Sequence, residues 1–189
     1  RKRGALMELN RLLLGDDSTS YTVVTGRPQG VKYVITLDAD TRLPMGGAKK
    51  LVECMEHPLN RPVVDKERKI VTRGYGILQP QVGVDIESAN KTTFARIFAG
   101  QGGIDPYSTV CSDIYQDLFG ESIFTGKGIY RLEVLEEVLD GRLPENQVLS
   151  HDLLEGSYVR CGLAGDVELI DGFPAKYNSY AKRHHRWLR

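Results

Sequence analysis

The sequence predicts an α/β fold with a mostly parallel β-sheet flanked by helices. Short β-branched segments, of which residues 31–37 (VKYVITL) are the clearest, alternate with longer segments whose apolar residues have helical spacing. This alternation is typical of domains in which helices connect parallel strands. A length of 189 residues and a hydrophobic content of 41% fit one packed core. Residues 1–189 are therefore predicted to form a single domain.

Helices are predicted where apolar residues recur every three or four positions and where suitable residues mark the ends. The first ends at the polar stretch GDDSTS, and the second is stopped by Pro58, because a residue before proline disfavours the helical conformation. Another begins with Ser150 as its N-cap. The predicted helices lie at residues 1–14, 45–57 and 86–100 (which ends at Gly100), at the end of 122–139, from 150 onward, and at 178–189.

Strands are predicted in four segments. Residues 31–37 are expected to form a buried strand, residues 69–82 one or two strands, and residues 166–177 a further one. A short strand follows a glycine-broken turn within residues 122–139. The predicted connections include a loop at residues 57–69 and a Gly- and Pro-rich irregular stretch at 100–110.

The charge and cysteine content exclude several classes of protein. Lys plus Arg and Asp plus Glu each number 25, so the net charge of zero gives no support for a nucleic-acid partner. The three cysteines are widely spaced and form no C-x-x-C pair, which disfavours a disulfide framework or a thiolate metal site and fits a reducing compartment. No apolar run is long enough to span a bilayer. Because the sequence has no initiator Met, we interpret it as a soluble piece of a longer protein.

Two aspartates follow the strand predicted at residues 31–37. Asp38 and Asp40 are two positions apart, so on an extended backbone their side chains would point to the same side. Carboxylates are preferred ligands of Mg²⁺ and Mn²⁺, which often complete their coordination with phosphate oxygens. One interpretation is therefore a metal site beneath a sugar nucleotide. The plainest alternative is a pair of loop aspartates that stabilise a turn.

The same D-x-D-x-T stretch also resembles the opening motif of haloacid dehalogenase-type phosphatases. That resemblance implies a nucleophilic role for Asp38 and an acid–base role for Asp40. A later G-D-x-x-x-x-D stretch, with Asp166 and Asp171, would supply further metal ligands.

Three further motifs follow in the second half of the chain. FTGKGIYR carries Gly126 and Gly128, and glycines allow a ligand to approach the backbone closely. SHDLLEG places Asp152 at the start of a predicted helix, where a carboxylate facing a cleft could accept a proton from a hydroxyl group. Glu155 is the second candidate for this base, and His151 could influence Asp152. Each motif taken alone is also explained by an ordinary turn or helix cap.

The third motif, RHHRWLR, places two arginines and the single tryptophan on the last predicted helix. Arg183 and Arg186 are three positions apart, so a helix presents them on one face. Paired guanidinium groups suit a diphosphate, and the flat face of Trp187 suits a sugar ring. An amphipathic basic helix with its Trp packed inward is the simpler alternative.

The order of these motifs resembles that of the family 2-like processive glycosyltransferases. More narrowly, residues 100–135 together with LPENQVLSHDLLEG resemble the glycosyltransferase domain of cyclic β-1,2-glucan synthases. The resemblance implies a GT-A-like (Rossmann-like) fold, incomplete at the N-terminus. It also implies inverting transfer of glucose from UDP-glucose to a growing β-1,2-glucan acceptor, with Mg²⁺ or Mn²⁺ as cofactor.

The resemblance also implies roles for individual residues. Asp38 and Asp40 would hold the metal and the nucleotide sugar, and Asp152 would be the catalytic base. The residues implied at the diphosphate or the acceptor are Arg183, Arg186, Trp187, Gly126, Gly128 and Lys2, the last within an opening K-x-G-x-L segment. His151 departs from the family pattern, because processive synthases usually have Glu there.

The same resemblance implies a very large, membrane-embedded synthase. This chain would lie on the cytoplasmic face of the bacterial inner membrane and would be anchored by segments outside it. Because earlier strands and a uridine-binding Asp would precede Arg1, we expect the chain to be inactive alone. The alternatives are the phosphatase, a non-catalytic module that binds sugar nucleotide or glucan, and a structural domain whose basic last helix meets a membrane or partner.

Overall fold

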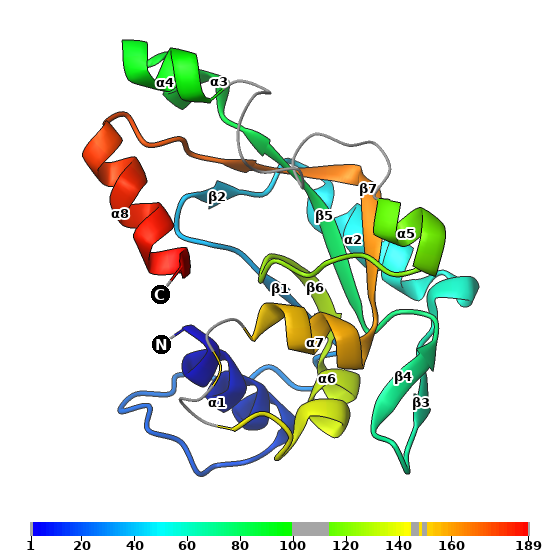
Figure 1. Cartoon of the computed structure of the whole chain (residues 1–189). Coiled ribbons are helices and arrows are strands. Elements are labelled where there is room, and N and C mark those ends of the chain that lie inside the picture. Colours follow the sequence, from blue (N-terminus) through cyan, green and yellow to red (C-terminus); the bar gives the residue numbers. More distant parts are fainter. Residues whose placement is uncertain (1, 100–113, 145–147, 149–150, 189) are drawn as a thin grey trace.

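A computed structural model describes residues 2–99, 114–144, 148 and 151–188, without the side chains of residues 2, 114, 187 and 188 (Figure 1). The helices described are α1 (Lys2–Leu14), α2 (Gly47–Glu56), the 3₁₀ helix η1 (Pro58–Asn60), α3 (Ile86–Asn90), α4 (Thr93–Phe98), α5 (Ile114–Phe119), α6 (Leu132–Leu139), α7 (Asp152–Val159) and α8 (Tyr177–Leu188). The strands described are β1 (Tyr33–Thr36), β2 (Thr41–Arg42), β3 (Val63–Asp65), β4 (Ile70–Arg73), β5 (Ile77–Val84), β6 (Gly128–Arg131) and β7 (Cys161–Asp171).

The α/β class is confirmed, but the prediction of a mostly parallel sheet is wrong. Within the described residues the main sheet has the order β1-β6-β5-β7-β2, and β3 pairs with β4 in a separate hairpin. Only the β5–β7 pair of the main sheet is parallel, and its other pairs are antiparallel. The prediction failed because alternation of helices and strands gives only the order of elements along the chain. The direction of each strand depends on which strands pair, and β6 lies between β1 and β5 and runs antiparallel to both.

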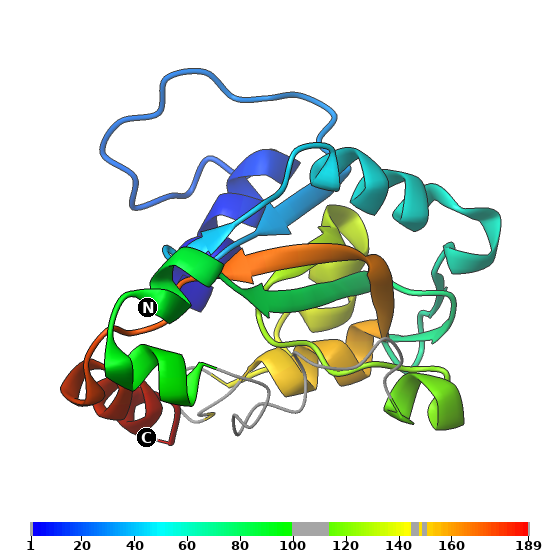
Figure 2. The same cartoon turned by 90° about the horizontal axis from the view of Figure 1, so that it is seen from above.

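Helices cover both faces of this sheet (Figure 2). Successive residues of a strand point to opposite faces. Ile77 of β5 therefore packs with α6 and α7, whereas its neighbour Leu78 packs against Leu51 and Met55 of α2. These four side chains are almost completely buried. The two resulting clusters hold the strand ends, and therefore the loops that follow them, in fixed positions.

Helix α1 is joined to this core by a buried polar contact. The side chain of Asn10 is 1% exposed. It donates a hydrogen bond to Glu136 at 3.1 Å and accepts one from the Tyr130 hydroxyl at 2.8 Å. Burial raises the pKa of Tyr130 to about 12, so this hydroxyl remains a donor at neutral pH. The N-terminal helix is thus anchored beside α6.

Other predicted elements are found with changed boundaries or in a different form. The helix expected at residues 86–100 is divided into α3 and α4, because Thr92 is extended and its hydroxyl caps α4 by accepting from the Ala95 amide at 3.0 Å. The loop expected at 57–69 contains η1 and β3. The strand β1 is mostly half-buried because it lies at the sheet edge.

The other predicted helices and strands are present. Helices lie at both ends of the chain, after the first strand, after the glycine-broken turn and after residue 150, and residues 69–82 hold two strands. The irregular stretch predicted at 100–110 and the Ser150 cap lie outside the described residues. Across the part of the chain that the structure describes, no helix has both the length and the apolar character needed to cross a membrane.

Candidate functional site

The two aspartates Asp38 and Asp40 lie in a tight turn between β1 and β2. The Thr41 amide donates a hydrogen bond to the Asp38 carbonyl at 3.0 Å, which closes the turn. The extended backbone expected for this stretch is therefore wrong. The strand β1 ends at Thr36, and the chain then crosses to the opposite edge of the sheet, where β2 pairs with β7.

Lys127 connects this turn to the end of β7. Its ammonium group forms an ion pair with Asp171, the last residue of β7, and lies 3.7 Å from Oδ2 of Asp38. The hydroxyl of Thr41 donates to the other oxygen of Asp171 at 2.5 Å. The Lys127 side chain is only 13% exposed. Lys127 was not among the predicted site residues, although its position between Gly126 and Gly128 could have indicated it.

The last helix α8 reaches the same turn through Arg183. Its guanidinium group forms an ion pair with the Asp40 carboxylate. It also donates to the carbonyl of Gly172 at 3.3 and 3.4 Å, and the Gly172 amide donates to the Asp40 carbonyl at 3.0 Å. The structure therefore brings together two motifs that lie 143 residues apart in the sequence.

Asp152 lies on the other side of the glycine turn. It is the first residue of α7, as predicted. An added Cβ at Gly126 would lie 3.0 Å from both Asp152 carboxylate oxygens. Gly126 also has a φ of +82°, a conformation that favours glycine. The turn that carries Lys127 toward Asp38 thus also contacts the predicted base.

The second candidate base, Glu155, is held by α1. Arg3 donates to the Glu155 carboxylate at 3.0 Å, and the two side chains are 17% and 15% exposed. Burial raises the pKa of Glu155, the nearby charge of Asp152 raises it further, and the hydrogen bond from Arg3 opposes both. Arg3, like Lys127, was not among the predicted site residues.

A change of Glu155 to Gln is expected to remove part of the pH dependence of stability. Because the pKa of Glu155 is raised in the folded chain, the folded state binds this proton more tightly than the unfolded chain. The resulting stabilisation is full below the ordinary pKa of 4.5 and is lost as the pH rises through the raised folded pKa. In urea unfolding between acidic and neutral pH, the free energy of unfolding should therefore fall less in Glu155→Gln than in the wild type. Glu137→Gln, an exposed change on α6, should keep the wild-type dependence; an equal dependence in Glu155→Gln would contradict the assignment.

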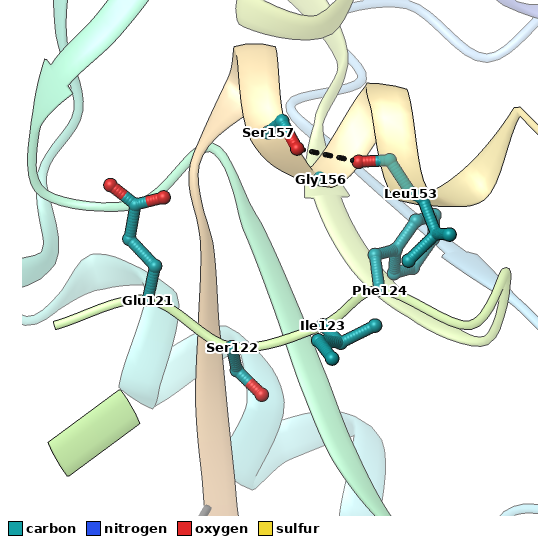
Figure 3. A pocket seen from close by; sticks show the side chains of 7 residues that line it. All are labelled: Glu121, Ser122, Ile123, Phe124, Leu153, Gly156 and Ser157. Atoms are coloured by element: carbon teal, nitrogen blue, oxygen red, sulfur yellow. Dashed lines mark hydrogen bonds between the residues drawn. The ribbon is translucent and has the colours of Figure 1, made fainter. Parts of the chain in front are cut away.

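The segment before the glycine turn fixes the position of α7 (Figure 3). An added Cβ at Gly156 would lie 3.0 Å from Cβ of Phe124, so the two backbones pack closely. A cavity of about 60 Å³ remains beside them. Its lining residues are Glu121, Ser122, Ile123, Phe124, Leu153, Gly156 and Ser157. Pockets that bind small molecules are typically about 300–1,000 Å³, so this space is too small to enclose a sugar.

The remaining predicted site residues lie farther along the same helices or at the chain ends. Arg186 is exposed and lines an open hollow of about 520 Å³ together with Ala181, Lys182 and His185. Trp187 lies in α8 and Lys2 begins α1, but their side chains lie outside the described residues. Arg183 therefore contacts the turn that holds Asp40, whereas Arg186 lines this hollow.

The acidic residues named for the phosphatase interpretation lie in two places. Asp171 contacts Lys127, whereas Asp166 is exposed on β7. Burial raises the pKa of Cys54 on α2, and the negative charge of Asp166 raises it further. The register between β5 and β7 shifts at this point, from Pro80 opposite Ala164 to Gln81 opposite Glu168. Asp166 lies within this irregular segment.

A metal ion would need ligands from outside this set of carboxylates. Among the side chains that the structure describes, no group of three or more His, Cys, Asp or Glu residues could hold one. Magnesium commonly takes only one or two protein carboxylates and fills its coordination with phosphate oxygens and water. Asp38 and Asp40, from a single turn, fit that pattern of donors.

The fold and the site together define an α/β protein in which acidic and basic side chains are matched at one end of the sheet. No family model matches the chain. Over 191 aligned residues the chain is 50% identical to the cyclic beta-(1,2)-glucan synthase NdvB of Rhizobium meliloti (strain 1021). The match covers 100% of the chain and 7% of that protein. The predicted resemblance to cyclic β-1,2-glucan synthases is therefore confirmed, with the chain similar to a segment of such a synthase.

Proposed function

We propose that the chain carries the glycosyltransferase site of a cyclic β-1,2-glucan synthase. The observation that carries this proposal is the turn at Gly126–Gly128, which contacts Asp152 on one side and approaches Asp38 through Lys127 on the other. A proton acceptor and a pair of carboxylates that could hold a divalent cation are the groups that a metal-dependent inverting sugar transfer would use. The 50% identity to NdvB supports the same class.

The proposed reaction is transfer of glucose from UDP-glucose to a hydroxyl of a glucan chain. Asp152 takes the proton of that hydroxyl as its oxygen bonds to the anomeric carbon, and the bond from this carbon to the diphosphate breaks with inversion. Arg183 and Arg186 stabilise the negative charge on the departing UDP, with Lys2 as a further contact. Trp187 and the backbone at Gly126 and Gly128 hold the acceptor.

The proposal includes a divalent cation, Mg²⁺ or Mn²⁺, held by Asp40 and Asp38. When bound, the cation acts as a Lewis acid on the diphosphate. The proposal also includes a GT-A-like fold, to which the mixed sheet and its covering helices lend support. In the complete protein, segments outside this chain would anchor it to the cytoplasmic face of the membrane.

Calorimetric titration of the chain with UDP and UDP-glucose, with and without Mn²⁺, tests this proposal. Binding is expected to require Mn²⁺ and to fall at least tenfold in Asp40→Ala, because the variant loses one of two metal ligands. Asp65→Ala, in the β3–β4 hairpin, is the control for loss of a carboxylate elsewhere. Equal binding by Asp40→Ala and the wild type would contradict the metal role.

The same samples distinguish the alternative classes. Hydrolysis of p-nitrophenyl phosphate that depends on Mg²⁺ and on Asp38 would support the phosphatase instead. Nucleotide binding by the chain, together with a complete synthase that transfers no glucose, would support a non-catalytic binding module.

A further inference from the structure

Lys127 is held between two carboxylates by the backbone of its turn. Gly126 and Gly128 flank it with φ angles of +82° and +154°. An added Cβ at Gly128 would lie 2.3 Å from the Leu78 carbonyl oxygen, so the turn lies directly against β5. This close packing fixes the backbone of the turn, and so fixes the point from which the Lys127 side chain extends. The fold therefore places its ammonium group beside the carboxylates of Asp171 and Asp38.

The carboxylates proposed to bind the metal thus already face protein cations. Lys127 lies 3.7 Å from Asp38, and Arg183 forms an ion pair with Asp40. A divalent cation and a lysine ammonium group repel each other at short range, and both are attracted to the same carboxylate oxygens. Binding of the metal to Asp38 therefore requires Lys127 to withdraw or to find another anion.

We propose that Lys127 is an internal counter-ion that couples metal binding to nucleotide binding. In the ligand-free chain its ammonium group neutralises Asp38. When metal and nucleotide bind together, the ammonium group moves from Asp38 to the diphosphate and stays tethered by Asp171. This inference rests on the proposed function, since it assigns the diphosphate as the new partner of Lys127.

Asp171 is suited to the tethering role. It accepts a hydrogen bond from Thr41 at 2.5 Å while it pairs with Lys127, so its carboxylate has a fixed orientation. Its exposed fraction is 19%, compared with 42% for Asp38. The more exposed aspartate is the one that a ligand can reach, and the more buried one keeps the lysine. Metal and nucleotide then bind cooperatively. The diphosphate draws Lys127 away from Asp38, which favours the metal, and the metal displaces Lys127 from Asp38, which frees the lysine for the diphosphate.

Titration of the chain with Mn²⁺ alone, followed by electron paramagnetic resonance of the free ion, tests this coupling. Lys127→Met is expected to bind Mn²⁺ about tenfold more tightly than the wild type, because removal of a neighbouring positive charge strengthens cation binding to a carboxylate. Saturating UDP should raise Mn²⁺ affinity in the wild type and much less in the variant. Lys127→Arg should behave as the wild type.

Lys66→Met, an exposed change in the β3–β4 hairpin, is the matched control and should leave Mn²⁺ affinity unchanged. Equal Mn²⁺ affinity in Lys127→Met and the wild type would overturn the inference, as would failure of both to bind Mn²⁺. Should Lys127→Met not fold, Lys127→Gln keeps a polar side chain without the charge and takes its place. The Mn²⁺ titration contains no sugar, so it tests Lys127 independently of the reaction. A complete synthase that transfers no glucose would contradict only the proposed reaction.

Discussion

Asp152→Asn in a complete synthase is expected to lower glucose transfer by a factor of about 10² to 10⁴. The asparagine keeps the size of the side chain beside Gly126 but cannot accept a proton from the acceptor hydroxyl. Binding of UDP-glucose should be unchanged, because Asp38, Asp40 and the arginines remain. Initial rates of glucan synthesis and calorimetric binding of the donor would separate the two effects.

The control for this variant is Asp140→Asn, a change at an exposed aspartate that ends α6. It should retain wild-type transfer. Turnover retained by Asp152→Asn would contradict the assignment of the base. Glu155, one helical turn farther along α7, would then be the group to replace, because it lies near Asp152 and its pKa is raised.

Gly128→Ala is expected to reduce the free energy of unfolding of the chain by about 3 kcal/mol. An added Cβ would lie 2.3 Å from the carbonyl oxygen of Leu78 and 3.1 Å from Cδ of Pro80. Relief of this overlap would force β6 away from β5 and would disturb the centre of the sheet. Urea unfolding followed by circular dichroism measures the loss.

Gly46→Ala provides the matched control for the backbone contribution. Gly46 has a φ of +78°, and nothing lies within 4 Å of its added Cβ. Its replacement should therefore reduce stability only by the conformational term, about 1 kcal/mol. An equal loss in both variants would show that close packing at Gly128 contributes nothing, and the fixed position of Lys127 would then need another explanation.

The helices of this chain were largely predictable because their patterns are local. The leucines of α1, the apolar residues of α6 and the proline after α2 act within one or two turns of their own segment. The single helix predicted at residues 86–100 was wrong for a local reason as well, since Thr92 caps a new helix there. The sequence pattern of apolar residues continued across a break that only the backbone reveals.

The sheet and the site were predictable only in part, because they depend on contacts between distant residues. The motifs gave Asp38, Asp40, Asp152 and Arg183 as candidate site residues, and their order indicated a glucan synthase. The glycine motif contains Lys127, but its local pattern does not show that this residue lies between Asp38 and Asp171. That contact exists because β6 follows the glycine turn and pairs with both β1 and β5.

The sequence by itself determined where most helices lie and which residue types are available for chemistry. The tertiary structure alone decided the strand directions, the pairing of Arg183 with Asp40 and the position of Lys127 beside two carboxylates. The physical reason is the distance along the sequence over which each interaction acts. Helical spacing and caps act over a few residues, whereas the ion pair between α8 and the β1–β2 turn joins residues 143 positions apart, which only the folded sheet brings together.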